Sequence, residues 1–407
     1  MRGRALRVIS ECKRIAQMSE EPDRITRRFL TPPVRDVHAL LRSRMESLRM
    51  TVHTDAAGNL RGLWKPPGGR AKRLILGSHI DTVPNAGAFD GVLGVALALE
   101  WIQIAQELNL PLSIEGIAFS EEEGVRFGVP FIGSRALAGR FDPALLALKD
   151  ADRVTVADAI RTFGLDPGQI GDAALDADVL GFVEMHIEQG PVLEFEGLPV
   201  AAVTAIVGQT RLTLEFRGHA NHAGTTPMNL RHDALAGAAE WIGAVETAAQ
   251  KGDGLIATVG KIDAEPNAAN VIAGTARVSL DVRHTDDRAR KAAVESLLAQ
   301  AQAIVAKRGL VLRLTRQMDQ PAVPMDERLT AYLVDAIVAA SLPEKRMASG
   351  AGHDAMVMAA RVPAAMLFLR SPSGISHHPD ETVLEEDVEA ALHVGRKFLQ
   401  RLAAEVR

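Results

Sequence analysis

Apolar and polar positions follow two different patterns along the chain, and the first pattern is that of buried strands. Apolar runs that end in polar residues occupy 73–83 (RLILGSHIDTV), 112–124 (LSIEGIAFSEEEG) and 181–194 (GFVEMHIEQGPVLE). Such runs are typical of buried strands that end at a turn. Residues 91 to about 107 read as a buried helix after the first run. Strands that alternate with helices predict an α/β fold, with a mainly parallel sheet and helices on both faces.

The second pattern begins near residue 204, where apolar and polar positions alternate. TRLTLEFRG (210–218) is typical of a half-exposed antiparallel strand. We expect a helix at 229–250, paired strands in GLIATVGKIDAE and GTARVSLDVRH, a helix at 286–308 and a strand in LVLRLTRQ. This order, βαββαβ, makes a complete two-layer α+β sandwich whose ends lie close together. The sequence therefore predicts an inserted domain at 204–318, within a first domain formed by 1–203 and 319–407.

The two ends of the chain read as parts of the first domain. PAVPMDERL (321–329) marks the return to it, followed by a helix at about 327–341, a strand in AAMLFLR and a terminal helix. The first 21 residues predict an amphipathic surface helix, because they lack the apolar core and cleavage site of a secretory signal. No stretch approaches the ~20 apolar residues that span a bilayer. We therefore expect a protein without a membrane partner.

Composition narrows the class of protein further. A length of 407 residues favours two domains, and 47% hydrophobic with 24% charged residues is an ordinary globular composition. The net charge of −5 provides no electrostatic footprint for nucleic acid. The single cysteine, Cys12, excludes an internal disulfide framework and fits a reducing compartment. We expect a cytoplasmic location.

Ionisable residues gather where the predicted strands end. In open α/β sheets, ligands bind beyond the carboxyl ends of the strands. Imidazoles and carboxylates that converge from separate strands are the ligand types of a borderline divalent metal ion. Asp90, on a turn flanked by glycine, is the candidate to bridge two ions. Asp81 follows His79 by two residues, so both face the same side of a strand, and it could accept the second ring N–H of His79. The full set is His79, Asp81, Asp90, Glu121, Glu122, Glu123, His186, Glu188, His377 and His378.

Six motifs carry a resemblance to a known family. GSHIDTV, FDG, SEEEG, EMHIEQGPVLE, GHANHAGTTPM and SHHPDE, in this order, resemble the hydantoinase/carbamoylase family of binuclear metal amidohydrolases, part of the metallo-aminopeptidase superfamily. The match extends over nearly the whole chain, and HIEQGP with HAGTTPM is specific to this family. The resemblance implies two divalent ions per chain, which the ligand types allow to be Zn, Mn, Co or Ni. It assigns one ion to His79, Asp90 and His186, and the other to Asp90, Glu123 and His377, with His378 as the neighbouring alternative.

The resemblance also implies roles around the metal ions. Glu122 matches the general base, and Asp81 belongs with it to the catalytic residues. His222 would contact the substrate or stabilise the oxyanion. Further substrate contacts are implied for Gln189, Asn270 and Arg283, whose planar guanidinium suits a carboxylate. The family's homodimer, formed through the inserted domains, would place His222 in the partner's site. Asp354 reads as a helix cap and His353 as a structural residue.

Several functions are consistent with these residues. The leading hypothesis is hydrolysis of an N-carbamoyl-L-amino acid to the amino acid, ammonia and carbon dioxide. Allantoate and β-ureidopropionate are alternative substrates of the same chemistry. More distant alternatives are an aminopeptidase, an N-acyl deacylase, or a binding protein that has lost catalysis. The last is disfavoured because every implied ligand and Glu122 are present.

Overall fold

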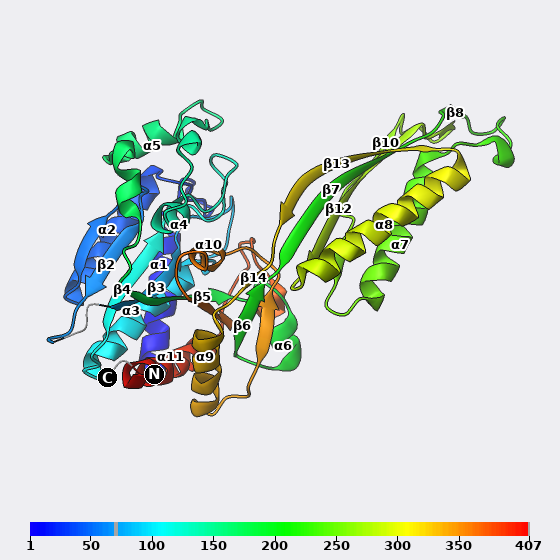
Figure 1. The fold of residues 1–407 in the computed structure, drawn as a ribbon. Helices are drawn as coiled ribbons and strands as arrows, with labels where there is room; N and C mark the ends of the chain where they lie inside the picture. Colours follow the sequence, from blue (N-terminus) through cyan, green and yellow to red (C-terminus); the bar gives the residue numbers. More distant parts are fainter. Residues whose placement is uncertain (69–71, 406–407) are drawn as a thin grey trace. The chain divides into compact units, whose positions relative to one another are not determined.

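The computed structural model describes residues 1–68 and 72–405, which form two compact units (Figure 1). The large unit consists of Met1–Thr204 and Met325–Arg407, and the inserted unit of Ala205–Pro324. The inserted unit was expected at 204–318. It begins one residue later and ends six residues later than expected. The second shift arises because strand β13 (Val311–Gln320) continues beyond the predicted LVLRLTRQ. In addition, β14 (Val323–Pro324) pairs with residues 205 and 206.

The main sheet has nine strands within the described residues; eight of them lie wholly or mostly in the large unit, and β14 falls within Ala205–Pro324. Their order is β1-β2-β4-β3-β5-β16-β6-β14, and β15 also pairs with β6. The four central strands, β4, β3, β5 and β16, run parallel to one another. The outer pairings are antiparallel. The mainly parallel sheet is therefore confirmed. The bounds are β1 Thr51–Thr54, β2 Leu60–Trp64, β3 Arg73–His79, β4 Ser113–Phe119, β5 Val179–Ile187, β6 Val200–Ile206, β15 Arg346–Ser349 and β16 Ala364–Leu369.

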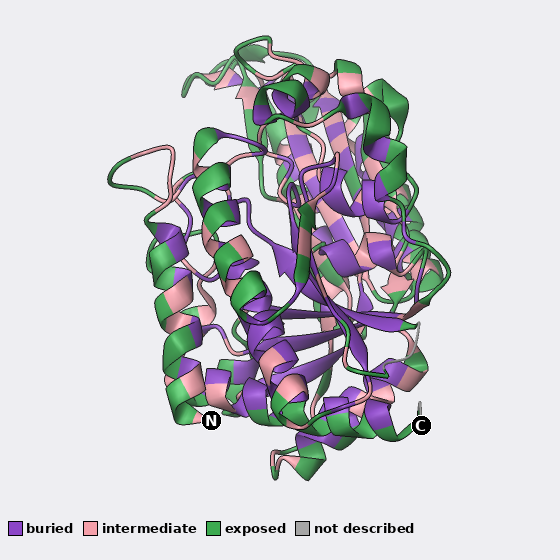
Figure 2. Cartoon of the chain, turned by 90° about the vertical axis from the view of Figure 1, so that its left-hand side faces the viewer, coloured by how far each residue is buried: buried purple, intermediate pink, exposed green. Residues whose placement is uncertain are grey.

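Helices cover both faces of this sheet, as expected. On one face α3 (Val92–Glu107) packs against β3, β4 and β5, and α11 (Glu385–Glu405) packs against α1 (Arg2–Ala16), α3 and α9 (Glu327–Ala339). Val183, Met185 and Ile187 of β5 join this core, so the alternating Glu184 and His186 point to the other face. There, α10 (Asp354–Met358) packs against β5 and β16. Figure 2 shows the central strands buried and the outward sides of the helices exposed.

The sequence explains why α3 is the central helix. Its residues from Val92 to Ile102 are all buried and, apart from Glu100, carry no charge, which fits a helix that is apolar on nearly every side. The remaining helices of the large unit are short or peripheral. They are α2 Pro32–Ser47, α4 Ile132–Leu137, α5 Val156–Phe163 and α6 Val192–Glu196, with 3₁₀ turns η1 Pro143–Ala147, η2 Pro167–Ala173 and η4 Pro372–Gly374.

The inserted unit has the expected βαββαβ order, except that the second expected strand is divided into two, β9 and β10. β7 (Gly208–Arg217), α7 (Ala234–Lys251), β9 (Ile256–Thr258), β10 (Ile262–Glu265), β12 (Thr275–His284), α8 (Asp287–Arg308) and β13 follow one another. The antiparallel sheet has the order β10-β12-β7-β13, and β9 also pairs with β12. Both helices pack on this sheet over the buried alternate residues of β7 and β12.

Two details of the inserted unit differ from the prediction. The expected start of its first helix at residue 229 is wrong, because the carboxylate of Asp233 caps α7 by accepting the Ala236 N–H. Residues 228–230 form a separate 3₁₀ turn, η3. The expected strand at 254–265 is divided into β9 and β10, whose registers on β12 differ by one residue. Gly260 lies in this irregularity, as is common at a β-bulge.

Among the described helices, none has both the length and the apolar character that crossing a membrane requires.

Candidate metal centre

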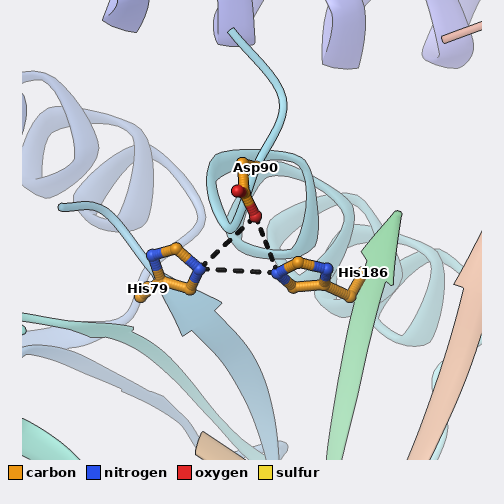
Figure 3. Close-up of side chains that lie close together, drawn as sticks. All are labelled: His79, Asp90 and His186. Atoms are coloured by element: carbon orange, nitrogen blue, oxygen red, sulfur yellow. Dashed lines mark hydrogen bonds and ion pairs between the residues drawn. The ribbon is translucent and has the colours of Figure 1, made fainter. Parts of the chain in front are cut away.

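His79, His186 and Asp90 converge at the carboxyl ends of two neighbouring parallel strands (Figure 3). His79 ends β3, His186 lies near the end of β5, and Asp90 stands just before α3. The two Nε2 atoms are 3.4 Å apart. The Asp90 Oδ1 lies 3.2 Å from Nε2 of His186 and 3.8 Å from Nε2 of His79. All three side chains are buried, so their polar atoms face one another rather than solvent.

The contacts of the other ring nitrogens, Nδ1 of His79 and Nδ1 of His186, show which ring atoms are available to a metal ion. Nδ1 of His79 lies 3.1 Å from the backbone carbonyl of Asp81, and Nδ1 of His186 lies 2.9 Å from that of Ile187. A carbonyl oxygen accepts only, so each Nδ1 carries the proton and donates it. In the neutral imidazoles both Nε2 lone pairs then point at each other, beside a carboxylate. Such an arrangement is stable with a shared cation, and two imidazoles with a carboxylate suit a divalent transition metal.

Gly91 explains how Asp90 reaches this position. Its φ of 64° lies in the left-handed region, and a Cβ there would come within 2.5 Å of the His79 ring. Only glycine satisfies both conditions without strain. The FDG turn therefore brings the Asp90 carboxylate directly over the end of β3.

A second group of possible ligands shares Asp90 with the first. The Asp90 Oδ2 lies 3.2 Å from Nε2 of His377, which is 3.6 Å from the Glu123 carboxylate. Asp90, Glu123 and His377 thus have ligand atoms close enough to hold one ion, as do His79, Asp90 and His186. His378 lies outside both groups and contacts Asp380 instead, at 3.6 Å. The two oxygens of Asp90 therefore face different groups.

The charges in the centre favour a bound cation. Burial opposes the charge of Asp90, yet its contacts with the imidazoles of His186 and His377 hold the pKa of this carboxyl well below its usual range. Burial also opposes protonation of His79 and His186, but Asp81 and Asp90 raise the pKa of these two imidazoles, respectively. Burial and the neighbouring Asp90 raise the pKa of Glu123 to about 7. The imidazoles and carboxylates thus compete for protons in a buried space, where a divalent cation would take the place of the protons, and the residues present fit metal ions.

Asp81 and Glu122 adjoin the two groups. The carboxylate of Asp81 accepts the backbone N–H groups of Glu122 and Glu123, at 2.9 and 3.0 Å, and lies 3.4 Å from Nδ1 of His79. The Nδ1 proton of His79 is closer to the Asp81 carbonyl than to this carboxylate. Glu122 lies with His79 and Glu123 in a further possible ligand group. Burial is the largest cause that raises the pKa of Glu122 well above its usual range; His79 opposes this rise, and Glu123 and Asp354 add to it.

Gln189 contacts the centre itself. Its φ is 60°, and its side-chain Nε2 donates to the Asp90 carboxylate at 3.2 Å and to Ser376 Oγ at 3.2 Å. It lies 3.4 Å from Nε2 of His377. Gln189 was expected to contact the ureido group of the substrate. In the structure its amide donates to Asp90, a possible metal ligand.

Three residues near the centre, His353, Asp354 and Glu381, were not predicted as site residues. The ring of His353 packs edge-on against His186, with centroids 4.5 Å apart, and its Nε2 lies 2.8 Å from Ser349 Oγ. Asp354 is the first residue of α10 and the helix has no side-chain cap, so the helix-cap interpretation is wrong. Glu381 was not singled out, although it closes the SHHPDE motif, and it accepts the backbone N–H of Asp90 at 2.9 Å.

The predicted substrate residues of the inserted unit lie at two separate positions. His222 lies on β8 (Asn221–His222), opposite Val271 of β11 (Val271–Ile272), and Asn270 accepts the Ala223 N–H at 2.9 Å. His222 and Asn270 are therefore neighbours, and both are exposed. Arg283 lies at the other end of β12, since eight residues of extended strand from Thr275 span about 26 Å. Its Nε and one Nη each donate to the Asp281 carboxylate at 3.0 Å.

Comparison with known proteins agrees with this fold. Residues 75–402 match the model of peptidase family M20/M25/M40. The chain is 37% identical to an allantoate deiminase from Arabidopsis thaliana, over 96% of this chain and 81% of that protein. It is 36% identical to an N-carbamoyl-L-amino acid amidohydrolase from Geobacillus stearothermophilus, over 93% of each chain. A solved amidase of the hydantoinase/carbamoylase family from Burkholderia multivorans superposes with a TM-score of 0.91 at 30% identity, over 98% of this chain and 97% of that one. The chain therefore belongs to peptidase family M20/M25/M40, among its hydantoinase/carbamoylase members.

Proposed function

We propose that this protein is a binuclear metal amidohydrolase that cleaves the carbamoyl C–N bond of an N-carbamoyl-L-amino acid. One water is consumed, and the amino acid, ammonia and carbon dioxide are released. The observation that carries the proposal is the position of Asp90, whose two oxygens face two different groups of possible ligands. The amidohydrolase names of the similar proteins support the same chemistry.

His79, Asp90 and His186 would hold one divalent ion, and Asp90, Glu123 and His377 the other. The ligand set suits Zn, Mn, Co or Ni. When bound, such ions polarise the carbonyl of the substrate and lower the pKa of the attacking water.

The chain's own residues would handle the protons and the geometry. Glu122 would take the proton of the attacking water and deliver it to the leaving nitrogen. Its burial and the raised pKa of its carboxyl suit a group that must accept a proton near neutral pH. Asp81 would fix the backbone of Glu122 and Glu123 through the two N–H groups that it accepts.

The inserted unit would recognise the substrate. Arg283 would pair with the carboxylate of the amino-acid half, while His222 and Asn270 would contact the ureido half or the oxyanion. Within one copy these residues are separated by most of the length of β12. That separation supports a homodimer through the inserted units, in which His222 completes the partner's site. The single, buried Cys12 suits the reducing cytoplasm.

Allantoate is the second candidate substrate. The identities to an allantoate deiminase and to an N-carbamoyl-L-amino acid amidohydrolase are 37% and 36%, so identity does not separate the two activities. Both substrates carry a ureido group and a carboxylate and would use the same residues.

The deciding experiment is a steady-state assay of metal-reconstituted protein. The panel contains several N-carbamoyl-L-amino acids, allantoate, β-ureidopropionate and a dipeptide. We expect the highest kcat/KM with an N-carbamoyl-L-amino acid, and no activity after chelation until Mn, Co or Zn is restored. A preference for allantoate would favour the second candidate, and full activity in metal-free protein would contradict both.

A further inference from the structure

Glu381 joins two segments that each supply a ligand candidate. One of its carboxylate oxygens accepts the backbone N–H groups of Phe89 and Asp90, at 3.0 and 2.9 Å. The other accepts the hydroxyl of Ser376, the residue before His377, at 3.2 Å. The side chain is buried, with 4% exposure. A single carboxylate thus connects the turn that carries Asp90 with the loop that carries His377.

The packing around Glu381 fixes this link. Gly87 lies against it so closely that a Cβ at position 87 would overlap the Glu381 side chain. The backbone N–H of Glu381 donates to the carbonyl of His378 at 3.0 Å, which closes a turn directly after His377. The position of Glu381 is therefore set both by its own backbone and by the turn that it contacts.

The ligand candidates differ in what holds them. His79 and His186 belong to central strands of the sheet, whose hydrogen bonds fix their positions. His377 lies on the loop between η4 and α11, has a φ of 56° and is half exposed. A ligand on a loop depends on side-chain contacts for its geometry, and groups behind the ligands often decide how tightly a metal site binds.

We infer that Glu381 is a positioning residue that fixes Asp90 and His377 relative to each other and so preorganises the second group, Asp90, Glu123 and His377. The inference rests on the proposed binuclear function. Glu381 acts through hydrogen bonds from its two oxygens, and it need not contact an ion or the substrate. The first group, which uses the opposite oxygen of Asp90 and two strand residues, depends on it less.

The test is a metal titration of the apoprotein with Mn²⁺ or Zn²⁺ in competition with a chromophoric chelator. Wild type is expected to bind two equivalents. Glu381→Ala should weaken one equivalent by about 10- to 100-fold, the usual effect of losing such a partner, and leave the other near its wild-type affinity. Glu381→Gln should keep both, because its amide oxygen can accept the two N–H groups and its NH₂ can donate to Ser376. Hydrogen exchange of the Asp90 amide should be faster in Glu381→Ala and unchanged in Glu381→Gln.

Two further variants keep the result interpretable. Glu381→Asp shortens the side chain so that it cannot reach both segments, and it should also weaken the binding of one metal equivalent. It replaces Glu381→Ala as the test if that variant does not fold. Asp55→Ala is the matched control, since Asp55 is a buried carboxylate that accepts the backbone N–H groups of Ala57 and Asn59 elsewhere in the large unit. It should reduce stability and leave both equivalents unchanged.

Three results would overturn the inference. They are wild-type affinities in both Glu381→Ala and Glu381→Asp, weakening of both equivalents in Glu381→Gln, or weakening in Asp55→Ala equal to that in Glu381→Ala. The second result would mean that the charge of Glu381 matters rather than its hydrogen bonds. A wild-type protein that binds fewer than two equivalents would instead overturn the binuclear function on which the inference rests.

Discussion

The carboxylate of Asp81 accepts the backbone N–H of Glu122 at 2.9 Å and thereby ties the end of β3 to the loop after β4. The same carboxylate accepts the N–H of Glu123 at 3.0 Å. One buried side chain thus sets the backbone from which both the proposed base and a proposed metal ligand project.

Replacing Asp81 should damage both stability and activity. Asp81→Ala leaves two buried N–H groups without their acceptor, so we expect a loss of about 2 kcal/mol or more in the free energy of unfolding. Displacement of Glu122 should lower kcat by about 100-fold. Denaturant unfolding and steady-state kinetics measure the two effects. Asp81→Asn keeps one acceptor oxygen, so its free energy of unfolding and its kcat should lie between those of wild type and Asp81→Ala. An Asp81→Ala enzyme with wild-type kcat would contradict the positioning role.

Glu122 and Glu123 should give different phenotypes despite being adjacent. Glu122→Gln should lower kcat by about 100- to 10,000-fold, the range for loss of a general base, while metal content and folding stay near wild type. Glu123→Ala should instead lose one equivalent of metal. Elemental analysis together with kinetics distinguishes them, and exchanged phenotypes would show that the roles of the two residues are reversed.

Arg283→Lys should raise KM more than it changes kcat. Lysine keeps the charge but loses the planar fork, so binding of carboxylate substrates should weaken by about 1–3 kcal/mol. The control is Arg277→Lys, because Arg277 lies on the same strand and pairs with Glu215 and Glu265. KM is measured across the substrate panel, and equal values for wild type and Arg283→Lys would remove Arg283 from the substrate site.

His222 should act in the partner's site. His222→Ala and Glu122→Gln are each expected to be nearly inactive, and the two proteins are mixed under conditions that exchange subunits. Random exchange makes half of the dimers mixed, each with one intact site of two, so about a quarter of wild-type activity should return. If proven exchange leaves the mixture inactive, His222 acts within its own chain or not at all.

His38 should make the large unit less stable in acid. It is buried in α2 against Phe163, and among the described residues its Nε2 has no hydrogen-bond partner. Burial, with Arg42 and Arg35 nearby, lowers the pKa of His38 to about 4. In the unfolded chain the pKa of a histidine is near 6.5. The contribution of neutral His38 to the free energy of unfolding is therefore complete above about pH 6.5 and is lost as the pH falls towards 4. The full loss is about 3 kcal/mol.

His38→Phe keeps an aromatic ring without a proton to gain, and it serves as the reference for this effect. The difference in unfolding free energy between wild type and His38→Phe should therefore fall by about 3 kcal/mol between pH 7 and pH 4. Urea unfolding at several pH values measures it. Parallel pH profiles of the two proteins would contradict the predicted effect.

The pattern of the sequence placed His79 and His186 at strand ends and Asp90 just before a buried helix, and the family resemblance assigned the three to one ion. The parallel strands bring such positions to one edge of the sheet. Strands β1, β2 and β6, which lie outside the parallel centre of the sheet, were not foreseen as separate elements, since their place in the sheet depends on pairing with distant residues.

Side-chain partners outside a strand were harder to foresee. Glu381 and Asp90 are 291 positions apart, and no spacing rule connects residues on two loops. The pairing of Arg283 with Asp281, by contrast, follows a signal that was present, because residues two apart on a strand share a face. The start of α7 could also have been placed correctly, since Asp233 is a strong capping residue.

The order of strands in the large unit has a consequence for biosynthesis. β16 (Ala364–Leu369), which lies between β5 and β6, comes late in the chain, and His377 follows it. A ribosome must release the whole inserted unit before either appears, whereas His79, Asp90 and His186 emerge long before. The residues of the first group of possible ligands are therefore all made well before His377. The second group, Asp90, Glu123 and His377, is complete only after His377 has been made, so under the proposed function the first ion would find its ligands before the second.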